Sequence, residues 1–395
     1  MRAVPTCLLH HLLLWLSAAS AAHDSRAFPH FTAGQLATLS APDPTSQLDP
    51  KNAAGHLAKM LIPRPPDTAN NTLVRNYIVS HLRALSWDVQ EDSFKDSTPY
   101  GEKTFVNVIA TKDKHAASKL VLSAHHDSKF FPDFPENQFV GATDSAAPCA
   151  IMLDLATVLD PFFPPAATAP HSGTTLQLVF FDGEEAYKQW TATDSTYGSR
   201  HLAAKWSKQY VPTRSFGPAA TVLSTIEHLV LLDLLGAASP LVTNYFADTG
   251  WLFDHLVSSQ ARLAEQGLLD VHELVGGQDA KGKWEDWDSF FVPRTSAGMA
   301  WHIEDDHIPF LKQGVPILHV IASPFPRVWH TLADDATALN LPTLKRWNLI
   351  FRLFTAEYLG LAVPEQAPQE EREKERRHAE LVSRLYFVGW RPGMD

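Results

Sequence analysis

Apolar residues along this chain gather in short runs that alternate with longer amphipathic stretches. Helical spacing first appears over 72–85, and a strand-like run follows at 105–111. The later apolar runs are 120–124, 176–181, 229–234 and 316–321, and the predicted helices between them are 146–159, 198–206 and 251–266. Unbroken apolar runs that alternate with helices predict an α/β fold, a three-layer α/β/α sandwich around a mostly parallel central sheet.

The two ends of the chain differ in character from this alternating region. Residues 23–50 are rich in Ala, Pro, Ser and Thr with little periodicity, which predicts an exposed lead-in, with ordered structure beginning near Leu57. Residues 51–362 are predicted to form a single domain. Residues 363–395 are predicted to be a charged extension without a catalytic role, because residues 366–377 are densely charged.

Residues 1–22 have the pattern of a secretory signal peptide. Arg2 supplies a positive charge, residues 8–16 an apolar stretch, and residues 17–22 small side chains suited to cleavage. The stretch is too short to span a bilayer, and the alternative is an ordinary helix packed on the domain. We therefore expect a protein without a membrane span that is secreted or stays in the secretory pathway. The sequon at Asn70 further predicts a glycoprotein.

Composition narrows the possible functions. A chain of 395 residues, 45% of them apolar, can bury a large core without internal repeats. The formal net charge of −11 argues against a nucleic-acid binder, which needs a basic surface. Cys149 is the one cysteine left after removal of residues 1–22, so the mature chain has no intrachain disulfide. Because no interaction motif stands out, we expect a monomer.

Acidic and imidazole side chains recur at the ends of the predicted strands. Polar residues placed independently would not fall repeatedly at the same end of apolar runs. Because ligands of parallel α/β sheets collect beyond the carboxyl ends of the strands, we expect these side chains to share one site. They are His125 and Asp127 after 120–124, Glu184 and Glu185 after 176–181, Asp233 within 229–234, and His330 after 316–321.

Three side chains form a plausible ligand set for zinc. Asp144, Glu185 and His330 offer two oxygens and one nitrogen, which leaves a fourth position open, as in catalytic zinc sites. Glu184 would point elsewhere, and a carboxylate beside a metal but not bound to it suits general base and acid work. Taken alone, Asp144 also fits the N-cap of the helix predicted over 146–159.

The order of these residues resembles the zinc aminopeptidase-like fold family, whose members bind two metals through a His-x-Asp segment, an Asp, a Glu-Glu pair, another Asp and a final His. Longer segments resemble the animal-type glutaminyl cyclases more closely, over roughly residues 55–360. These segments are HHDSKFF (125–131), FVGATDSAAPCAIML (139–153), FFDGEEAYKQW (180–190), YGSRHLAAK (197–205), VLLDLLGA (230–237), IEDDHIPFLKQGVPILH (303–319) and SPFPRVWHT (323–331).

The resemblance implies a glutaminyl-peptide cyclotransferase. Such an enzyme converts N-terminal Gln, and more slowly Glu, of peptides and proteins into pyroglutamate with release of ammonia or water. It also implies one zinc ion held by Asp144, Glu185 and His330. Glu184 would shuttle the proton, while Asp233 and Asp305 would share a carboxylate network with it. His319 would support the site from behind.

The same resemblance implies an aromatic substrate pocket. Trp190 would be a mobile lid and Trp329 a fixed floor, with Phe325 beside them, although each aromatic taken singly is more often a core residue. Glu304 occupies a position where similar enzymes have a glutamine, and it would contact the substrate amide. A small pocket would hold the Gln side chain alone, so we expect broad tolerance beyond the first residue.

Two departures from the family pattern concern the segment around residue 125. The animal enzymes often pair a cysteine at the Cys149 position with one at position 124, where this chain has Ala124. Loss of such a bridge typically reduces stability by about 2–4 kcal/mol unless packing compensates. His126 stands where an aromatic residue is usual, which leaves the role of His125 open.

Two other functions remain as alternatives at this point. His125, Asp127 and Asp233 are available to hold a second metal, and two metals would favour a secreted zinc aminopeptidase that hydrolyses N-terminal residues. A binding protein without turnover is the third class, and the presence of Glu184 with a full ligand set argues against it.

Overall fold

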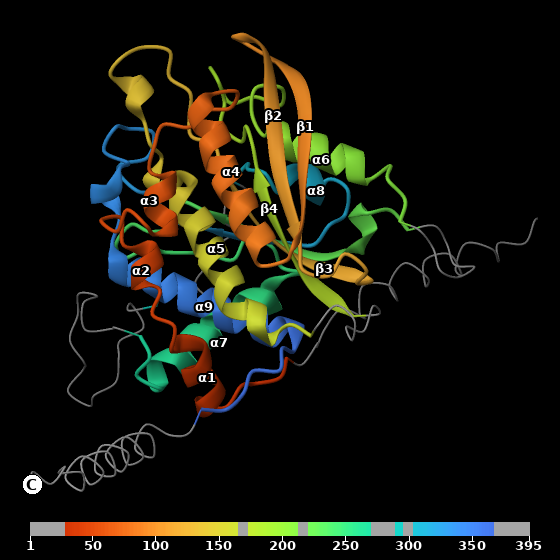
Figure 1. Cartoon of the computed structure of the whole chain (residues 1–395), viewed down its shortest axis with the longest axis vertical. Coiled ribbons are helices and arrows are strands. Elements are labelled where there is room, and N and C mark those ends of the chain that lie inside the picture. Colours follow the sequence, from red (N-terminus) through yellow and green to blue (C-terminus); the bar gives the residue numbers. More distant parts are fainter. Residues whose placement is uncertain (1–27, 165–172, 212–219, 270–288, 295–302, 367–395) are drawn as a thin grey trace, which may run out of the picture.

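The structure is a computed structural model that describes residues 28–164, 173–211, 220–269, 289–294 and 303–366. Its centre is a six-stranded sheet in the order β1-β2-β4-β3-β5-β6. Strands β4, β3, β5 and β6 run parallel, whereas β2 pairs antiparallel with both β4 and β1. The predicted α/β fold with a mostly parallel sheet is therefore confirmed, with an antiparallel hairpin at one edge (Figure 1).

The elements of the described part of the chain follow one another in this order. The strands are β1 (Asp88–Thr98), β2 (Gly101–Thr111), β3 (Ser118–His125), β4 (Thr174–Phe181), β5 (Ile226–Asp233) and β6 (Ile317–Ile321). The α-helices are α1 (Ala33–Ser40), α2 (Thr45–Leu48), α3 (His56–Met60), α4 (Ala69–Ala84), α5 (Ala147–Leu159), α6 (Tyr197–Trp206), α7 (Gly250–Glu265), α8 (Ile308–Leu311) and α9 (Leu341–Leu359). Short turns of tighter or wider helix are η1 (Glu136–Gln138), η2 (Ala142–Ala146), η3 (Asp160–Phe162), η4 (Leu223–Thr225) and η7 (Ala336–Ala338).

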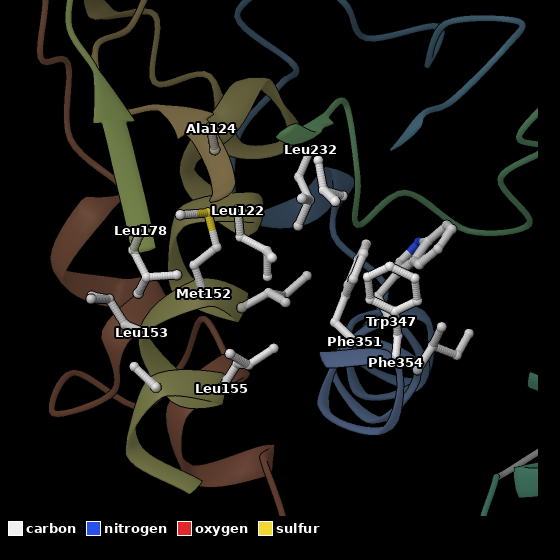
Figure 2. Close-up of a cluster of buried hydrophobic side chains, with 14 of the residues drawn as sticks. Leu122, Ala124, Met152, Leu153, Leu155, Leu178, Leu232, Trp347, Phe351 and Phe354 are labelled. Atoms are coloured by element: carbon white, nitrogen blue, oxygen red, sulfur yellow. The ribbon is translucent and has the colours of Figure 1, made fainter. Parts of the chain in front are cut away.

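Helices cover both faces of the sheet because alternate strand residues point to opposite sides. In β3, Leu120 and Leu122 belong to one apolar core and Val121 to the other. The first core is closed by α5 and α9 with α1, α3, α4 and α7, and the second by α6 and α8 (Figure 1). Figure 2 shows the first core, where Met152 of α5 and Phe351 of α9 lie around the β3 side chains.

Helix α5 is apolar on nearly all sides because it is a core helix. Among the described residues, the stretch Glu136–Phe162 is the one helical segment long and apolar enough to cross a membrane, but 72% of its most apolar window is buried within the protein. Cys149 lies in this helix, where its thiol donates to the His125 carbonyl oxygen at 3.2 Å. The cysteine thus has a partner in a tightly packed position opposite Ala124.

Strand β1 was not predicted, although β2 to β6 were. Its residues DVQEDSFKDST are largely polar and only Asp92 among them is fully buried, so no apolar run marks it. Full pairing with β2, from Asp88 opposite Thr111 to Thr98 opposite Gly101, holds this strand in the sheet instead.

The prediction of an exposed lead-in over 23–50, with order beginning near Leu57, is wrong for the residues that the structure describes. Helix α1 starts after Thr32, whose hydroxyl caps it, and buries Leu36 and Leu39 against the first core. Helix α2 buries Leu48 in the same way. These helices span one or two turns, which is too short for a periodic pattern to stand out.

The predicted C-terminal extension also begins as packed structure. Val363 is 4% exposed, and its carbonyl oxygen accepts from the Gln35 amide at 2.9 Å. The Thr38 hydroxyl donates to the Pro364 carbonyl oxygen at 2.7 Å. Residues 363–366 therefore tie α1 to the end of α9, while the remaining extension and residues 1–22 lie outside the described residues.

Candidate metal centre and substrate pocket

The three predicted metal ligands converge at the carboxyl ends of the parallel strands. Asp144 lies in η2 between β3 and α5, Glu185 follows β4, and His330 lies in the loop after β6. One ligand atom of each side chain lies within 4.8 Å of the others. His330 Nε2 is 3.4 Å from Asp144 Oδ2 and 3.2 Å from Glu185 Oε1. The strand-end argument thus located these side chains together.

Asp144 is not the N-cap of α5. The cap position is Ala146, which makes no side-chain hydrogen bond, and Asp144 itself has non-helical backbone angles of φ −119° and ψ 81°. The turn depends on Gly141, whose φ is +60°. A Cβ atom at Gly141 would collide with the Asp144 carbonyl oxygen. This residue must be glycine for the carboxylate to be presented where it is.

The chemistry of the three side chains fits a divalent cation. Two buried carboxylates and one imidazole are common zinc ligands. Glu185 Oε1 is buried and, within the described part of the chain, has no hydrogen-bond donor. Burial alone would lower the pKa of His330, but Glu185 and Asp144 raise it to about 9. The carboxylates therefore favour a positive charge at this point, and a bound cation would replace the imidazole proton.

A second group of possible ligands shares Asp144. One atom each of His125, Asp144 and Asp233 also lies within 4.8 Å of the others. His125 Nε2 is 2.9 Å from Asp144 Oδ1 and 3.6 Å from Asp233 Oδ1, and its Nδ1 is 3.3 Å from Asp127. His125 thus bridges three carboxylates. The Ser145 hydroxyl and the Leu234 N–H hold the same Asp233 oxygen.

Buried carboxyl groups border the ligand set on its other side. Glu184, Asp233 and Asp305 are 6%, 7% and 2% exposed. Burial raises the pKa of Glu184 well above its ordinary value, and the negative charge of Asp305 adds to that effect. Burial and Asp305 likewise raise the pKa of Asp233 to about 6. His319 Nε2 is 2.8 Å from Asp305 Oδ2, which fixes that side chain from behind.

These groups open into one cavity of about 470 Å³. The predicted aromatic residues are its wall, since Trp190, Phe325 and Trp329 all line it. The Trp329 ring stacks on the His330 ring with centroids 3.8 Å apart, and Phe325 packs against Trp329 at 5.0 Å. Trp190 and Trp329 are 36% and 39% exposed, so neither is a core residue. The alternative that these aromatics are core residues is therefore wrong.

A hydrogen bond crosses the mouth of the cavity. Trp190 Nε1 donates to Glu304 Oε2 at 3.0 Å. The loop that carries Trp190 is organised by Asp194, whose carboxylate accepts the N–H groups of three consecutive residues. These residues are Tyr187, Lys188 and Gln189. Trp190 is thus held at the rim from two sides.

Sequence reasoning missed several residues that shape the site. Lys129 Nζ lies 3.2 Å from Glu185 Oε2 and donates to the Ala186 carbonyl oxygen at 3.1 Å. Its place two residues beyond Asp127, in the segment that follows β3, was the available signal. Arg64 is fully buried and donates to the carbonyl oxygens of residues 126, 140 and 141, among others. Nothing in its local sequence marks it.

Comparison with known proteins places the chain among characterised families. The family model described as peptidase family M28 matches residues 107–355. A glutaminyl-peptide cyclotransferase-like protein of Mus musculus is 45% identical over 80% of this chain and 77% of its own length. The glutaminyl-peptide cyclotransferase of Drosophila melanogaster is 44% identical over 76% of this chain and 78% of its own length.

Solved structures give the same picture. The crystal structure of Macrostomum lignano glutaminyl cyclase is similar with a TM-score of 0.70 and 39% identity, over 85% of this chain and 96% of that chain. A Zn-dependent exopeptidase from Parabacteroides distasonis shares the fold with a TM-score of 0.55 and 20% identity, over 84% of this chain and 99% of that chain.

Proposed function

The chain belongs to peptidase family M28 and, within it, to the glutaminyl-peptide cyclotransferases, and from that premise we infer that it converts N-terminal Gln of peptides into pyroglutamate. The observation that carries this conclusion is the identity of 40–45% to cyclotransferases over about four fifths of the chain. The cavity agrees with it, because a closed aromatic wall faces a metal-ligand set beside an unbound carboxylate. The aminopeptidase alternative is not favoured.

The reaction is an intramolecular displacement on the substrate. The α-amine nitrogen attacks the γ-carbonyl carbon, a carbon–nitrogen bond forms, and the bond to the amide nitrogen breaks to release ammonia. We propose that Glu184 takes the proton from the amine and returns it to the departing nitrogen. Asp233 and Asp305 would orient the amine, since both are buried beside Glu184 on one side of the cavity. Trp329 and Phe325 would hold the side chain in a bent conformation and exclude water.

The metal is proposed to be a single zinc ion held by Asp144, Glu185 and His330. When bound, it would polarise the γ-carbonyl group. A single ion is supported by the position of His125, which bridges Asp144 and Asp233 as a hydrogen-bonding group where a second ion would have to bind. Elemental analysis of the purified protein should give one zinc per chain, whereas two per chain would contradict this assignment.

The activity is tested by mass spectrometry of Gln-initiated and Leu-initiated peptides. We expect the Gln peptide alone to lose one ammonia, and a Glu-initiated peptide to lose water more slowly. Glu184→Gln should reduce the rate by about 10²–10⁴-fold while zinc stays bound. Glu265→Gln, which removes an exposed carboxylate of α7 outside the cavity, should leave the rate unchanged. Shortening of either peptide by one residue would instead show an aminopeptidase.

We propose further that the chain enters the secretory pathway and is glycosylated at Asn70 as a monomer. The signal pattern of residues 1–22 supports the first point. Asn70 supports the second, because it is exposed at the start of α4 and its Nδ2 donates only to the Pro63 carbonyl oxygen, at 2.7 Å, among the described residues. N-terminal sequencing of the expressed protein, glycosidase treatment and light scattering test the three points separately.

A further inference from the structure

We propose that Glu304 selects the second residue of the peptide substrate, favouring a basic residue over an acidic one. The proposal rests on the cyclotransferase activity inferred above and concerns the mouth of the same cavity. Glu304 is adjacent to Asp305 in sequence, yet the two differ in exposure: Asp305 is 2% exposed, whereas Glu304 is exposed at the rim.

The depth of the cavity orders the substrate. The ligand set and Glu184 lie at its buried end, so the α-amine and the γ-amide of the first residue must reach that end. The carbonyl group of the first residue and the whole second residue then lie toward the exposed rim. There the lining residues are Trp190, Trp329 and Glu304.

The cavity is large enough for this contact. Its volume of about 470 Å³ falls among pockets that hold drug-sized ligands, roughly 300–1,000 Å³, and exceeds what one glutamine side chain requires. The expectation of a small pocket that leaves the remaining peptide outside is therefore wrong. The second residue lies against the wall, and its charge is within reach of the rim groups.

The Glu304 carboxylate is held in place at this wall. Its Oε2 accepts the indole N–H of Trp190 at 3.0 Å, and Asp194 fixes the loop that carries Trp190. A carboxylate has about four acceptor positions, so it can still bind a substrate ammonium or guanidinium group. A fixed charge acts on one position of the substrate, because it does not follow the peptide around.

Two lysines also line the cavity and must be weighed. Lys129 is engaged with Glu185 and the Ala186 carbonyl oxygen, so it belongs to the buried end. Lys188 is exposed at the mouth and acts against Glu304 on a charged second residue. The contribution of Glu304 is for this reason measured as the change that its own substitution causes.

The experiment compares kcat/KM for peptides that begin Gln-Lys, Gln-Ala and Gln-Glu in wild type and Glu304→Gln. The ratio of the Gln-Lys value to the Gln-Glu value should fall about fivefold in the variant, in keeping with the strength of exposed ion pairs. The change should appear in KM, and the wild-type ratio should shrink at high salt because of screening. Gln-Ala should change least.

Two further variants keep the outcomes distinct. Glu265→Gln removes an exposed carboxylate outside the cavity and should leave the ratio unchanged. Trp190→Phe removes the indole N–H but keeps the Glu304 charge, and should retain most of the ratio. An unchanged ratio in Glu304→Gln, or an equal loss in Trp190→Phe, would overturn the proposal while the activity itself stands. Absence of pyroglutamate from every peptide in wild type would instead remove the activity on which the proposal rests.

Discussion

Asp144 is presented to the site by its neighbours. Arg64 binds the carbonyl oxygens of Val140 and Gly141 on one side of the turn, and Asp334 accepts the Thr143 N–H at 2.8 Å on the other. Arg64 and Asp334 are both fully buried. A ligand held this way is preorganised, because the turn cannot relax without breaking buried hydrogen bonds.

Gly141→Ala should disable the metal site. The left-handed φ alone costs an alanine about 1–2 kcal/mol, and the added Cβ would also meet the Asp144 carbonyl oxygen. We expect zinc affinity, measured by competition with a chelator, to fall together with the free energy of unfolding.

Gly360→Ala is the matched control for this substitution. Gly360 has the same φ of +60°, but no atom lies within 4 Å of an added Cβ. It should show the backbone cost without loss of zinc affinity. Equal effects of the two substitutions on zinc binding would refute the collision.

At the scale of elements, the short N-terminal helices act as a strap across the first core. The Phe31 N–H donates to Glu357 Oε1 at 2.7 Å, and Glu357 also pairs with Arg262 of α7. Phe28 stacks on His255 of α7 with centroids 4.3 Å apart. Segments from both ends of the chain thus join α7 and α9, which places residues 28–48 inside the cooperative unit.

Leu36→Ala should destabilise the protein as a core substitution does. Leu36 is 2% exposed, and removal of such a side chain typically costs about 2–5 kcal/mol. Leu73→Ala makes the same chemical change at a residue of α4 that is 61% exposed, and should stay within about 0.5 kcal/mol of wild type. Urea unfolding measures both. Similar small effects would mean that α1 does not pack in solution.

The contact between α3 and α4 should make stability depend on pH. Burial, with a smaller effect of the nearby His81, lowers the pKa of His56 to about 3, and its Nδ1 lies 2.7 Å from the Tyr77 hydroxyl. The unfolded chain therefore binds the proton first. The contribution of His56 is complete above about pH 6.5 and is lost as pH falls toward 3, by about 1.4 kcal/mol at pH 5.5.

His56→Asn removes this titration. Unfolding free energies measured at pH 7.5 and 5.5 should differ less in the variant than in wild type, by about 1 kcal/mol. Parallel curves for the two proteins would show that protonation of His56 does not oppose folding.

At the scale of the whole molecule, the metal joins segments that are far apart in the chain. Asp144, Glu185 and His330 come from three loops between residues 140 and 335, with acidic side chains gathered around them. Carboxylates at such distances repel one another unless a cation or a proton lies between them. The bound metal therefore contributes to the stability of the fold as well as to turnover.

Removal of the metal should lower Tm and abolish turnover together. Zinc restored at about 100 times its Kd should stabilise the protein by about 2.7 kcal/mol, which raises Tm by several degrees. Asp144→Asn should lose most of this zinc-dependent shift in a calorimetric scan. Turnover that persists after dialysis against a strong chelator would rule out a catalytic metal.

Local pattern was enough to predict much of the fold. The runs at 120–124 and 229–234 became β3 and β5, because a strand buried on both faces needs an unbroken apolar stretch. Strand β1 and helix α1 escaped prediction for opposite reasons. The first is polar and depends on its pairing partner, and the second is too short to show a period.

The sequence by itself determined which side chains carry the chemistry and at which end of the sheet they lie, because parallel strands deliver their carboxyl ends to one edge. Only the tertiary structure decided how they meet. The bridging of carboxylates by His125, the support of Glu185 by Lys129 and the bond between Trp190 and Glu304 join residues from separate loops. Such contacts depend on backbone turns and packing distances, which no local pattern of apolar and polar residues encodes.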